Sequence, residues 1–305
     1  MMYESKSTFI DHIAYYIEIY KEYDLFKVVL VFFDLFVQYI PYILASIIVS
    51  ALIARFLTPE KLKKALSHNR FASIIFSSLL GTISPLSSYA LIPFAGTLLL
   101  LGFPLGPVTA FIFSTPLMNP TIFILTLQGL GLKMAVARTI ATLLIGILSG
   151  VISETFFSKF SVLRENLKPK IPKTKAFLPY VFSMTKYMSK AFLLAVFLAS
   201  VVKVYLKAEY VAGFFGADKP WSIPIAALLG VPFYTCGGAT IPVVSSLMDL
   251  GMSSSAALAF FIAGPATNLP NVSAVFLTFK WQYLAFYLLL SVGLAVLSGY
   301  IFTIF

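Results

Sequence analysis

The amino-acid sequence predicts an all-α polytopic membrane protein with two inverted-topology repeats, re-entrant hairpins and discontinuous transmembrane helices. Three observations support this fold class: the chain is poor in charge, it contains long apolar runs, and one half of it resembles the other. Hydrophobic residues make up 59% of the 305 residues and charged residues only 11%, whereas a soluble domain carries roughly 25% charged residues. Such a chain cannot cover a globule with polar groups, so we expect a lipid bilayer as its solvent.

Long apolar runs give the outline of the fold. A helix needs about 20 apolar residues to cross the ~30 Å hydrocarbon core of a bilayer. Mostly apolar runs occupy residues 26–57, 134–157, 191–204 and 281–305. These runs predict a chain that crosses the membrane several times.

Charge divides the chain into segments. Residues 1–25 lack the features of a signal peptide, and their apolar residues recur at helical spacing, which predicts an amphipathic segment at the membrane interface. Stretches 58–70 and 158–175 hold ten of the 22 basic residues, and the positive-inside rule places both in the cytoplasm. We therefore expect the following segments: 1–25, the N-terminal amphipathic segment; 26–157, transmembrane repeat 1; 158–178, a basic cytoplasmic linker; and 179–305, transmembrane repeat 2.

An internal duplication appears when the sequence is shifted by 149 residues. Residues 73–119 and 222–268 then share 15 identities in 47 positions without a gap. Apolar bias alone would match some leucines and alanines, but it would not readily align two prolines, two glycines and an asparagine in one register. The matched pairs of this kind are Gly81/Gly230, Pro93/Pro242, Gly102/Gly251, Pro116/Pro265 and Asn119/Asn268.

The same order of elements is expected in both repeats. A long helix comes first, two short apolar stretches follow around a polar break, a third stretch is interrupted by proline and asparagine, and a full span comes last. Thirteen residues of helix reach only about 20 Å, so we interpret the two short stretches as a re-entrant hairpin. In repeat 1 the long helix, the two short stretches and the last span are expected at 26–57, 71–83, 90–102 and 133–157. Their counterparts in repeat 2 are expected at 179–207, 221–231, 239–250 and 281–304.

The number of crossings predicts the orientation of the second repeat. Three complete crossings, or five if every short stretch crosses, are odd numbers, so the second repeat is expected to be inverted relative to the first. Inverted repeats with broken helices near the bilayer midplane are typical of secondary transporters.

The interrupted stretches are the first candidate substrate site. Irregular backbone at membrane depth is tolerated only where protein or a water-filled cavity covers it, and Pro116, Pro120, Pro265 and Pro270 disrupt the two helices. An asparagine offers both a donor and an acceptor. Two interpretations stay open: each asparagine contacts a ligand, or each satisfies the broken backbone. The site residues expected here are Thr115, Asn119, Thr267 and Asn268.

The tips of the two hairpins are the second candidate. Short hydroxyl side chains and glycines allow a ligand to approach the backbone closely, and each tip precedes a helix start, which favours electron-rich groups. Tight turns between packed arms are the alternative. The tip residues are Ser87, Ser88 and Tyr89 in the first repeat and Tyr234, Thr235, Cys236, Gly237 and Gly238 in the second.

Ionisable residues inside the spans are candidates for ion coupling. Asp34 lies about two turns into the first span, and Lys186 and Lys190 share one helix face near the start of its counterpart. Asp34 is the best candidate for proton coupling, and a pairing of Asp34 with a lysine is the alternative.

Motifs of several other functional classes are missing from the sequence. There is no phosphate-binding loop, no H-E-x-x-H and no set of Cys and His with metal-ligand spacing. We therefore expect no cofactor, no bound metal, no nucleic-acid partner and no enzymatic activity. A channel-like pore for a small solute or ion, a membrane subunit of a larger transport assembly, and a homo-oligomer all remain compatible with the pattern.

The chain resembles the predicted permease family that includes the ArsP-like organoarsenical efflux permeases, related to the YraQ-type permeases. The resemblance is carried by "LIPFAGTLLLLGFPLGPVTAFIFSTPLMNPTIFILT" and "GGATIPVVSSLMDLGMSSSAALAFFIAGPATNLPNVSAV". It implies a multi-pass permease of the inner (plasma) membrane that exports a small solute, a metalloid or organoarsenical in some members. The first tip carries hydroxyls where arsenical exporters are expected to carry cysteine, so an anionic or metal-linked solute fits it as well.

Overall fold

Helices make up nearly all of the described part of the protein. The computed structural model describes residues 24–56, 70–84, 88–100, 102–157, 162–164, 192–231, 238 and 240–304; for 42–56, 70, 88–90, 93 and 270 it describes the backbone alone. Residues 1–23 of the predicted N-terminal segment and most of the basic linker lie outside these residues. The segment boundaries proposed for residues 1–25 and 158–178 therefore stay predictions.

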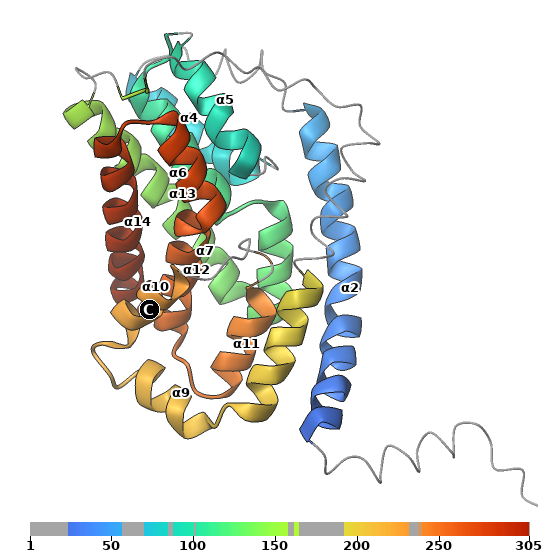
Figure 1. The fold of residues 1–305 in the computed structure, drawn as a ribbon. Helices are drawn as coiled ribbons and strands as arrows, with labels where there is room; N and C mark the ends of the chain where they lie inside the picture. The colour runs from blue at the N-terminus through green and yellow to red at the C-terminus, as the bar shows by residue number, and fades with distance from the viewer. Residues whose placement is uncertain are drawn as a thin grey trace, which may run out of the picture.

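The helices of the first half follow the order expected from the apolar runs (Figure 1). They are α2 (Asp24–Phe56), α4 (Arg70–Ile83), α5 (Ser88–Leu100), α6 (Leu105–Leu117) and α7 (Pro120–Phe157). Helix α7 is bent at Gly131, whose φ of 83° is a left-handed conformation that favours glycine.

The helices of the second half repeat this order. They are the helix Phe192–Tyr205, α9 (Ala208–Phe215), α10 (Ser222–Gly230), α11 (Ile241–Asp249), α12 (Ser254–Thr267), α13 (Leu269–Thr278) and α14 (Trp281–Phe302). Helices α2, α4, α5, α10, α11 and α14 begin and end within two residues of the predicted ranges. The agreement arises because proline, glycine and the lengths of the apolar runs are local signals.

Two described stretches are long and apolar enough to cross a membrane, Leu105–Phe157 and Trp281–Phe302. A third exists if Ser254–Thr267 and Asn271–Thr278, bent by 44°, form one span. Leu105–Phe157 contains 53 residues, or about 80 Å of helix. Because this is more than twice the thickness of a hydrocarbon core, the break before Pro120 and the bend at Gly131 must divide it.

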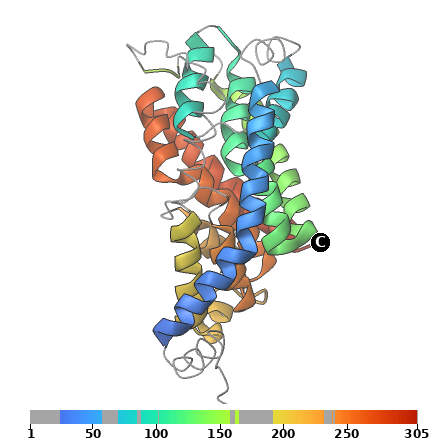
Figure 2. The same cartoon turned by 90° about the vertical axis from the view of Figure 1, so that its right-hand side faces the viewer.

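The last helices of the two halves are antiparallel. At one end, the Phe157 ring that closes α7 lies 5.0 Å from that of Phe286 and 6.3 Å from that of Tyr283, both near the start of α14. At the other end, the Lys133 amine lies 5.8 Å from the Phe302 ring centroid. Helix α2 is followed by the first basic stretch and α7 by the second. The C-termini of both helices lie on the same side of the molecule, and α9 lies on the opposite side (Figures 1 and 2).

Equivalent glycines make the same close contact in both halves. A Cβ on Gly81 of α4 would lie 3.2 Å from the Phe111 carbonyl oxygen of α6. A Cβ on Gly230 of α10 would lie 3.0 Å from the Phe260 carbonyl oxygen of α12, and both residues are 149 positions further along. Small residues let helix backbones approach in a membrane, so the duplicated sequence encodes duplicated packing.

A short segment of the linker is fixed to the second half. Leu163 forms an isolated antiparallel β-bridge with Phe279, which connects α13 to α14. The Arg164 side chain donates to the Phe279 carbonyl at 3.2 Å and stacks 4.3 Å from the Phe276 ring centroid. The α13–α14 junction is thus braced by residues 162–164.

A candidate substrate site at two helix breaks

The first break separates α6 from α7. Helix α6 ends after Pro116 and Leu117, and Met118 is extended, with φ −146° and ψ 141°. The side-chain oxygen of Asn119 accepts a hydrogen bond from the Ile122 backbone N–H at 2.9 Å. Asn119 is therefore the N-cap of α7, a position that asparagine favours because its oxygen satisfies an otherwise unpaired N–H group.

The second break separates α12 from α13 and is built in the same way. Asn268 accepts from the Asn271 backbone N–H at 2.9 Å, three residues on as in the first break. Its Nδ2 also donates to the Pro265 carbonyl at 3.0 Å. With only 6% of its surface exposed, Asn268 ties the two halves of a broken helix together.

Asn271 was not among the predicted site residues, and it is fully buried beside the second break. Its Nδ2 donates to the Pro265 carbonyl at 2.6 Å, while its Oδ1 has no hydrogen-bond partner among the described residues. A buried acceptor without a donor is costly. Comparison of the halves could not reveal it, because Ile122 stands at the equivalent position.

Both asparagines thus stabilise broken backbone, as one of the two interpretations expected. Ligand contact by the remaining amide atoms stays a prediction. The Nδ2 of half-buried Asn119 makes no hydrogen bond within the described residues, so it retains two N–H donors for another group.

The two threonines are buried next to the breaks. Thr115 donates its hydroxyl to the Phe111 carbonyl at 2.8 Å, and Thr267 donates to the Ala263 carbonyl at 2.7 Å. Because these bonds to the preceding turn use both donors, only the oxygen lone pairs of the threonines are left for a ligand.

The tips can be placed only in part. Ser87, Tyr234, Thr235, Cys236 and Gly237 lie outside the described residues, and Ser88 and Tyr89 are described only as the backbone that opens α5.

Gly238 is buried, and a Cβ there would lie 3.2 Å from the Leu125 side chain of α7. Further along, the Ser245 hydroxyl of α11 donates to the Gly129 carbonyl of α7 at 3.1 Å. The second arm of repeat 2 therefore packs on the helix that follows the first break.

The coupling candidates are not brought to the breaks by the described structure. Asp34 lies on the exposed side of α2, and Lys186 and Lys190 lie outside the described residues. Their role stays a prediction.

Arg138 is a second residue that sequence reasoning missed. It lies in the apolar run that predicted the last span of repeat 1, and its side chain is completely buried. Its Nη1 donates to Thr126 Oγ1 at 3.3 Å, and its guanidinium lies 4.5 Å from the Phe261 ring centroid of α12. The rule that charged residues inside spans are functional candidates would have identified it.

The 149-residue shift relates Arg138 to Tyr287 of α14. The Tyr287 ring lies 4.8 Å from that of Phe113 in α6, and its hydroxyl donates to the Ala266 carbonyl at 2.7 Å. Each of the two equivalent side chains therefore packs on a phenylalanine of the opposite half. Both halves meet at these broken helices.

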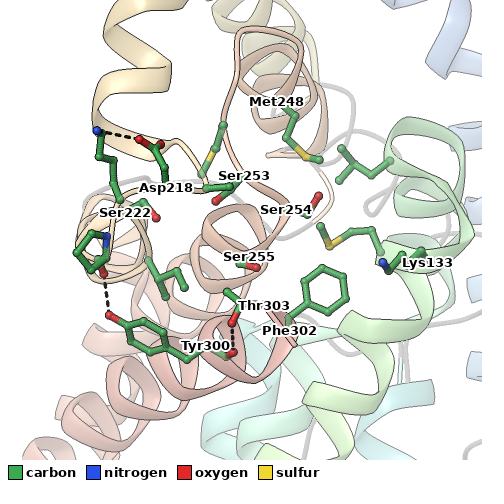
Figure 3. Close-up of a pocket in the computed structure, with 17 residues that line it drawn as sticks. Lys133, Asp218, Ser222, Met248, Ser253, Ser254, Ser255, Tyr300, Phe302 and Thr303 are labelled. Carbon is green, nitrogen blue, oxygen red and sulfur yellow. Dashed lines mark hydrogen bonds and ion pairs between the residues drawn. The ribbon is translucent and has the colours of Figure 1, made fainter. Parts of the chain in front are cut away.

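An open pocket of about 860 Å³ lies at the end of the molecule that carries α9 (Figure 3). Lys133 and Met134 of α7, Ser253, Ser254 and Ser255 at the start of α12, and Tyr300 of α14 are among the residues that line it. The breaks themselves do not line this pocket.

An ion pair modifies the charge of the pocket rim. Lys219 lies 2.8 Å from Asp218, and its hydrogen bond holds the pKa of that carboxyl below its usual value. Asp218 therefore stays ionised and offsets the charge of Lys219.

No group of three His, Cys, Asp or Glu side chains with metal-binding geometry occurs among the described residues.

Long apolar helices, two helix breaks and an arginine buried between the two halves are features of helical membrane proteins of the permease class. The chain belongs to a family described as predicted permeases, whose family model matches residues 25–304. Membership of this family confirms the resemblance expected from the sequence.

Three curated relatives cover most of the chain. It is 25% identical over 285 residues to UPF0718 protein YcgR of Bacillus subtilis, covering 88% of this chain and 94% of that protein. It is 21% identical over 266 residues to a putative two-component membrane permease complex subunit of Streptococcus mutans, with 83% and 87% covered. UPF0718 protein MJ0584 of Methanocaldococcus jannaschii is 20% identical over 299 residues, with 76% and 82% covered. No solved structure matches the chain significantly.

Proposed function

We propose that this permease is a secondary transporter that moves a small solute through a central site between the two helix breaks. The observation that carries the proposal is the matched pair of breaks, each capped by an asparagine three residues before the N–H group it satisfies. A scaffold needs no such interruption, because broken helices at membrane depth are costly unless they serve a cavity or a ligand.

Opposite orientation of the two halves is part of the proposal. The antiparallel course of α7 and α14 supports it, as does the position of the α2 and α7 ends on one side of the molecule. In transporters of this design, one half rocks against the other around a fixed site. The basic stretches assign that side to the cytoplasm.

Cysteine labelling tests the orientation. Cys236 is the one cysteine in the sequence, so Cys236→Ser gives a background for single cysteines at Lys170 and Ala217. We expect a membrane-impermeant maleimide to label Ala217→Cys in intact cells and Lys170→Cys only after the membrane is opened. Labelling of both in intact cells contradicts the orientation.

Transport assays test the site. We expect Asn119→Ala and Asn268→Ala to lower transport at least tenfold in cells or vesicles screened with metalloids, metals and oxyanions. Gln282→Ala is the matched control, because it removes an exposed amide at the start of α14. Normal transport by both asparagine variants refutes the site, and a neutral Cys236→Ser excludes thiol recognition of an organoarsenical.

The mode of transport has its own readout. A secondary transporter saturates with solute and slows when ionophores dissipate the ion gradient, and an exporter lowers the solute concentration inside the cell. A channel-like pore, the alternative, passes solute without saturation and follows only its own gradient.

A second candidate is a membrane subunit of a larger transport assembly. It is favoured by the printed name of the Streptococcus mutans relative, a putative subunit of a two-component membrane permease complex. Purified protein that transports the solute in liposomes would exclude an obligatory partner. Activity that appears only after another purified membrane component is added would support one.

A further inference from the structure

We infer that the second helix break binds an alkali cation at the side-chain oxygen of Asn271, as the coupling ion of transport; the inference rests on the permease function proposed above. Asn271 lies in the first turn of α13 and is fully buried. Its Oδ1 has no hydrogen-bond partner among the described residues, and almost none of that atom contacts solvent. Unpaired buried acceptors are rare in native proteins and costly. Its presence at a helix break therefore indicates an electropositive ligand.

The orientation of the Asn271 amide is fixed by its other end. The Nδ2 of Asn271 donates to the Pro265 carbonyl at 2.6 Å. If the amide were rotated by half a turn, its oxygen would face that carbonyl oxygen, and two acceptors in contact repel each other. The unpaired atom is therefore an oxygen, which accepts a donor or coordinates a cation.

The two breaks leave different atoms of their amides available. At the first break, the Asn119 oxygen accepts from the Ile122 N–H group, and its Nδ2 makes no hydrogen bond within the described residues. At the second break, the Nδ2 atoms of Asn268 and Asn271 both donate to the Pro265 carbonyl. The first break therefore keeps N–H donors for the solute, whereas the second keeps an oxygen, which suits a cation.

The helices that meet at the second break offer neutral oxygens and no charge. No Asp, Glu, His, Lys or Arg occurs in residues 254–278, which cover α12 and α13. A proton has no carboxylate to occupy there, and divalent cations usually take carboxylate ligands. The freed carbonyls and negative dipole end of an interrupted helix coordinate Na⁺ in secondary transporters. An alkali cation therefore fits this break better than a proton or a divalent ion.

No charged side chain hydrogen-bonds to the second break within the described part of the chain. The last helix of the second half reaches it with Tyr287, whose hydroxyl donates to the Ala266 carbonyl at 2.7 Å. The equivalent position in the first half is Arg138, which donates to Thr126 of α7 at 3.3 Å. A cation at the second break therefore has a neutral tyrosine as its neighbour from α14.

Cation binding to the purified protein tests the inference without knowledge of the solute. Wild-type protein in detergent would be prepared in choline chloride and titrated with sodium or potassium chloride at constant total salt. We expect saturable binding of radioactive sodium, or of rubidium in place of potassium. The thermal midpoint should rise with the logarithm of the cation concentration once the site is more than half filled.

Asn271→Ile gives the second break the residue that stands at the first, Ile122. It leaves no buried acceptor unpaired, and the Pro265 carbonyl keeps its bond from Asn268, so the variant should fold. Half-saturation for the cation should rise at least tenfold. Gln282→Ala is the matched control, because it removes an exposed amide at the start of α14, and it should bind the cation as wild type does.

Asn271→Asp adds a readout that a structural role of Asn271 would not give. A protonated aspartate can donate to the Pro265 carbonyl as the amide does, so this variant should fold as well. Its ionised form attracts a cation, and protons compete for the same oxygens. Cation affinity of Asn271→Asp should therefore rise with pH, whereas that of wild type should not. Equal pH profiles of the two proteins would place the ion elsewhere and overturn the site.

The outcomes separate the cation site from the permease function. If a solute found by the transport screen crosses equally well in choline and no alkali cation binds, the permease function stands and the cation inference is wrong. If Asn271→Ile lowers that cation-independent transport, the oxygen receives a donor of the solute instead, and the inference is again wrong. If the cation binds as expected but no solute crosses in wild-type liposomes, the site stands and the proposed function fails.

Discussion

Replacement of Asn268 by alanine should destabilise the protein more than replacement of Asn119. Asn268→Ala removes the N-cap bond from Asn271, for which about 1 kcal/mol is typical, and the buried bond to the Pro265 carbonyl, for which about 1 kcal/mol is also typical. Asn119→Ala removes one cap bond at a half-buried position. We therefore expect losses in the free energy of unfolding of roughly 2 and roughly 1 kcal/mol.

Reversible unfolding of the purified protein in mixed micelles, followed by circular dichroism, measures both losses. Asn268→Ser is the internal control, because serine can keep the cap but cannot reach Pro265, and its loss should lie between the other two. An Asn119→Ala variant as unstable as Asn268→Ala would show that the second bond contributes nothing. A large transport defect of Asn119→Ala with its small stability loss would then indicate direct contact between Asn119 and the solute.

Three further predictions concern packing and surface charge. Gly150→Ala should cost about 1–3 kcal/mol of stability in the same assay, because its Cβ would lie 2.9 Å from the Gly106 carbonyl oxygen. Gly293→Ala is the control and should cost nothing, because the space around Gly293 is open. Equal losses of stability in the two variants would contradict the packing. Tyr287→Phe should cost about 1–3 kcal/mol because it leaves a buried carbonyl without its donor, and a thermal midpoint equal to wild type would refute this. Lys203→Met breaks only an exposed ion pair, so its effect should stay below about 1 kcal/mol, and a larger loss would mean that the pair is shielded from solvent.

The helices and their breaks were predictable because their signals are local. Pro116 and Pro265 with the asparagines behind them mark both interruptions, and the lengths of the apolar runs give the helix ends to within two residues for the helices compared above. The duplication strengthens these signals, since each half is an independent copy of the same pattern. Helix direction relative to the bilayer depends on the odd number of crossings and stays a prediction.

The chemistry of the site was less accessible from sequence because it depends on contacts between distant segments. Arg138 meets Phe261, which lies 123 residues further along, and no local pattern shows which residue of the other half an inward-facing arginine contacts. Asn271 escaped detection for a different reason. The candidate asparagines are a pair related by the duplication, whereas this buried amide is present in only one half and Ile122 stands at its position in the other.

Among the described residues, a brace like that of residues 162–164 is found only in the second half. It holds the α13–α14 junction, whereas the corresponding bend at Gly131 has open space around it within 4 Å. If the two halves exchange shapes during transport, the braced half resists and the free one yields. The two access states of the transport cycle then differ in free energy, so the protein rests in one of them. Binding of the solute or of the coupling ion must supply the free energy that reaches the other.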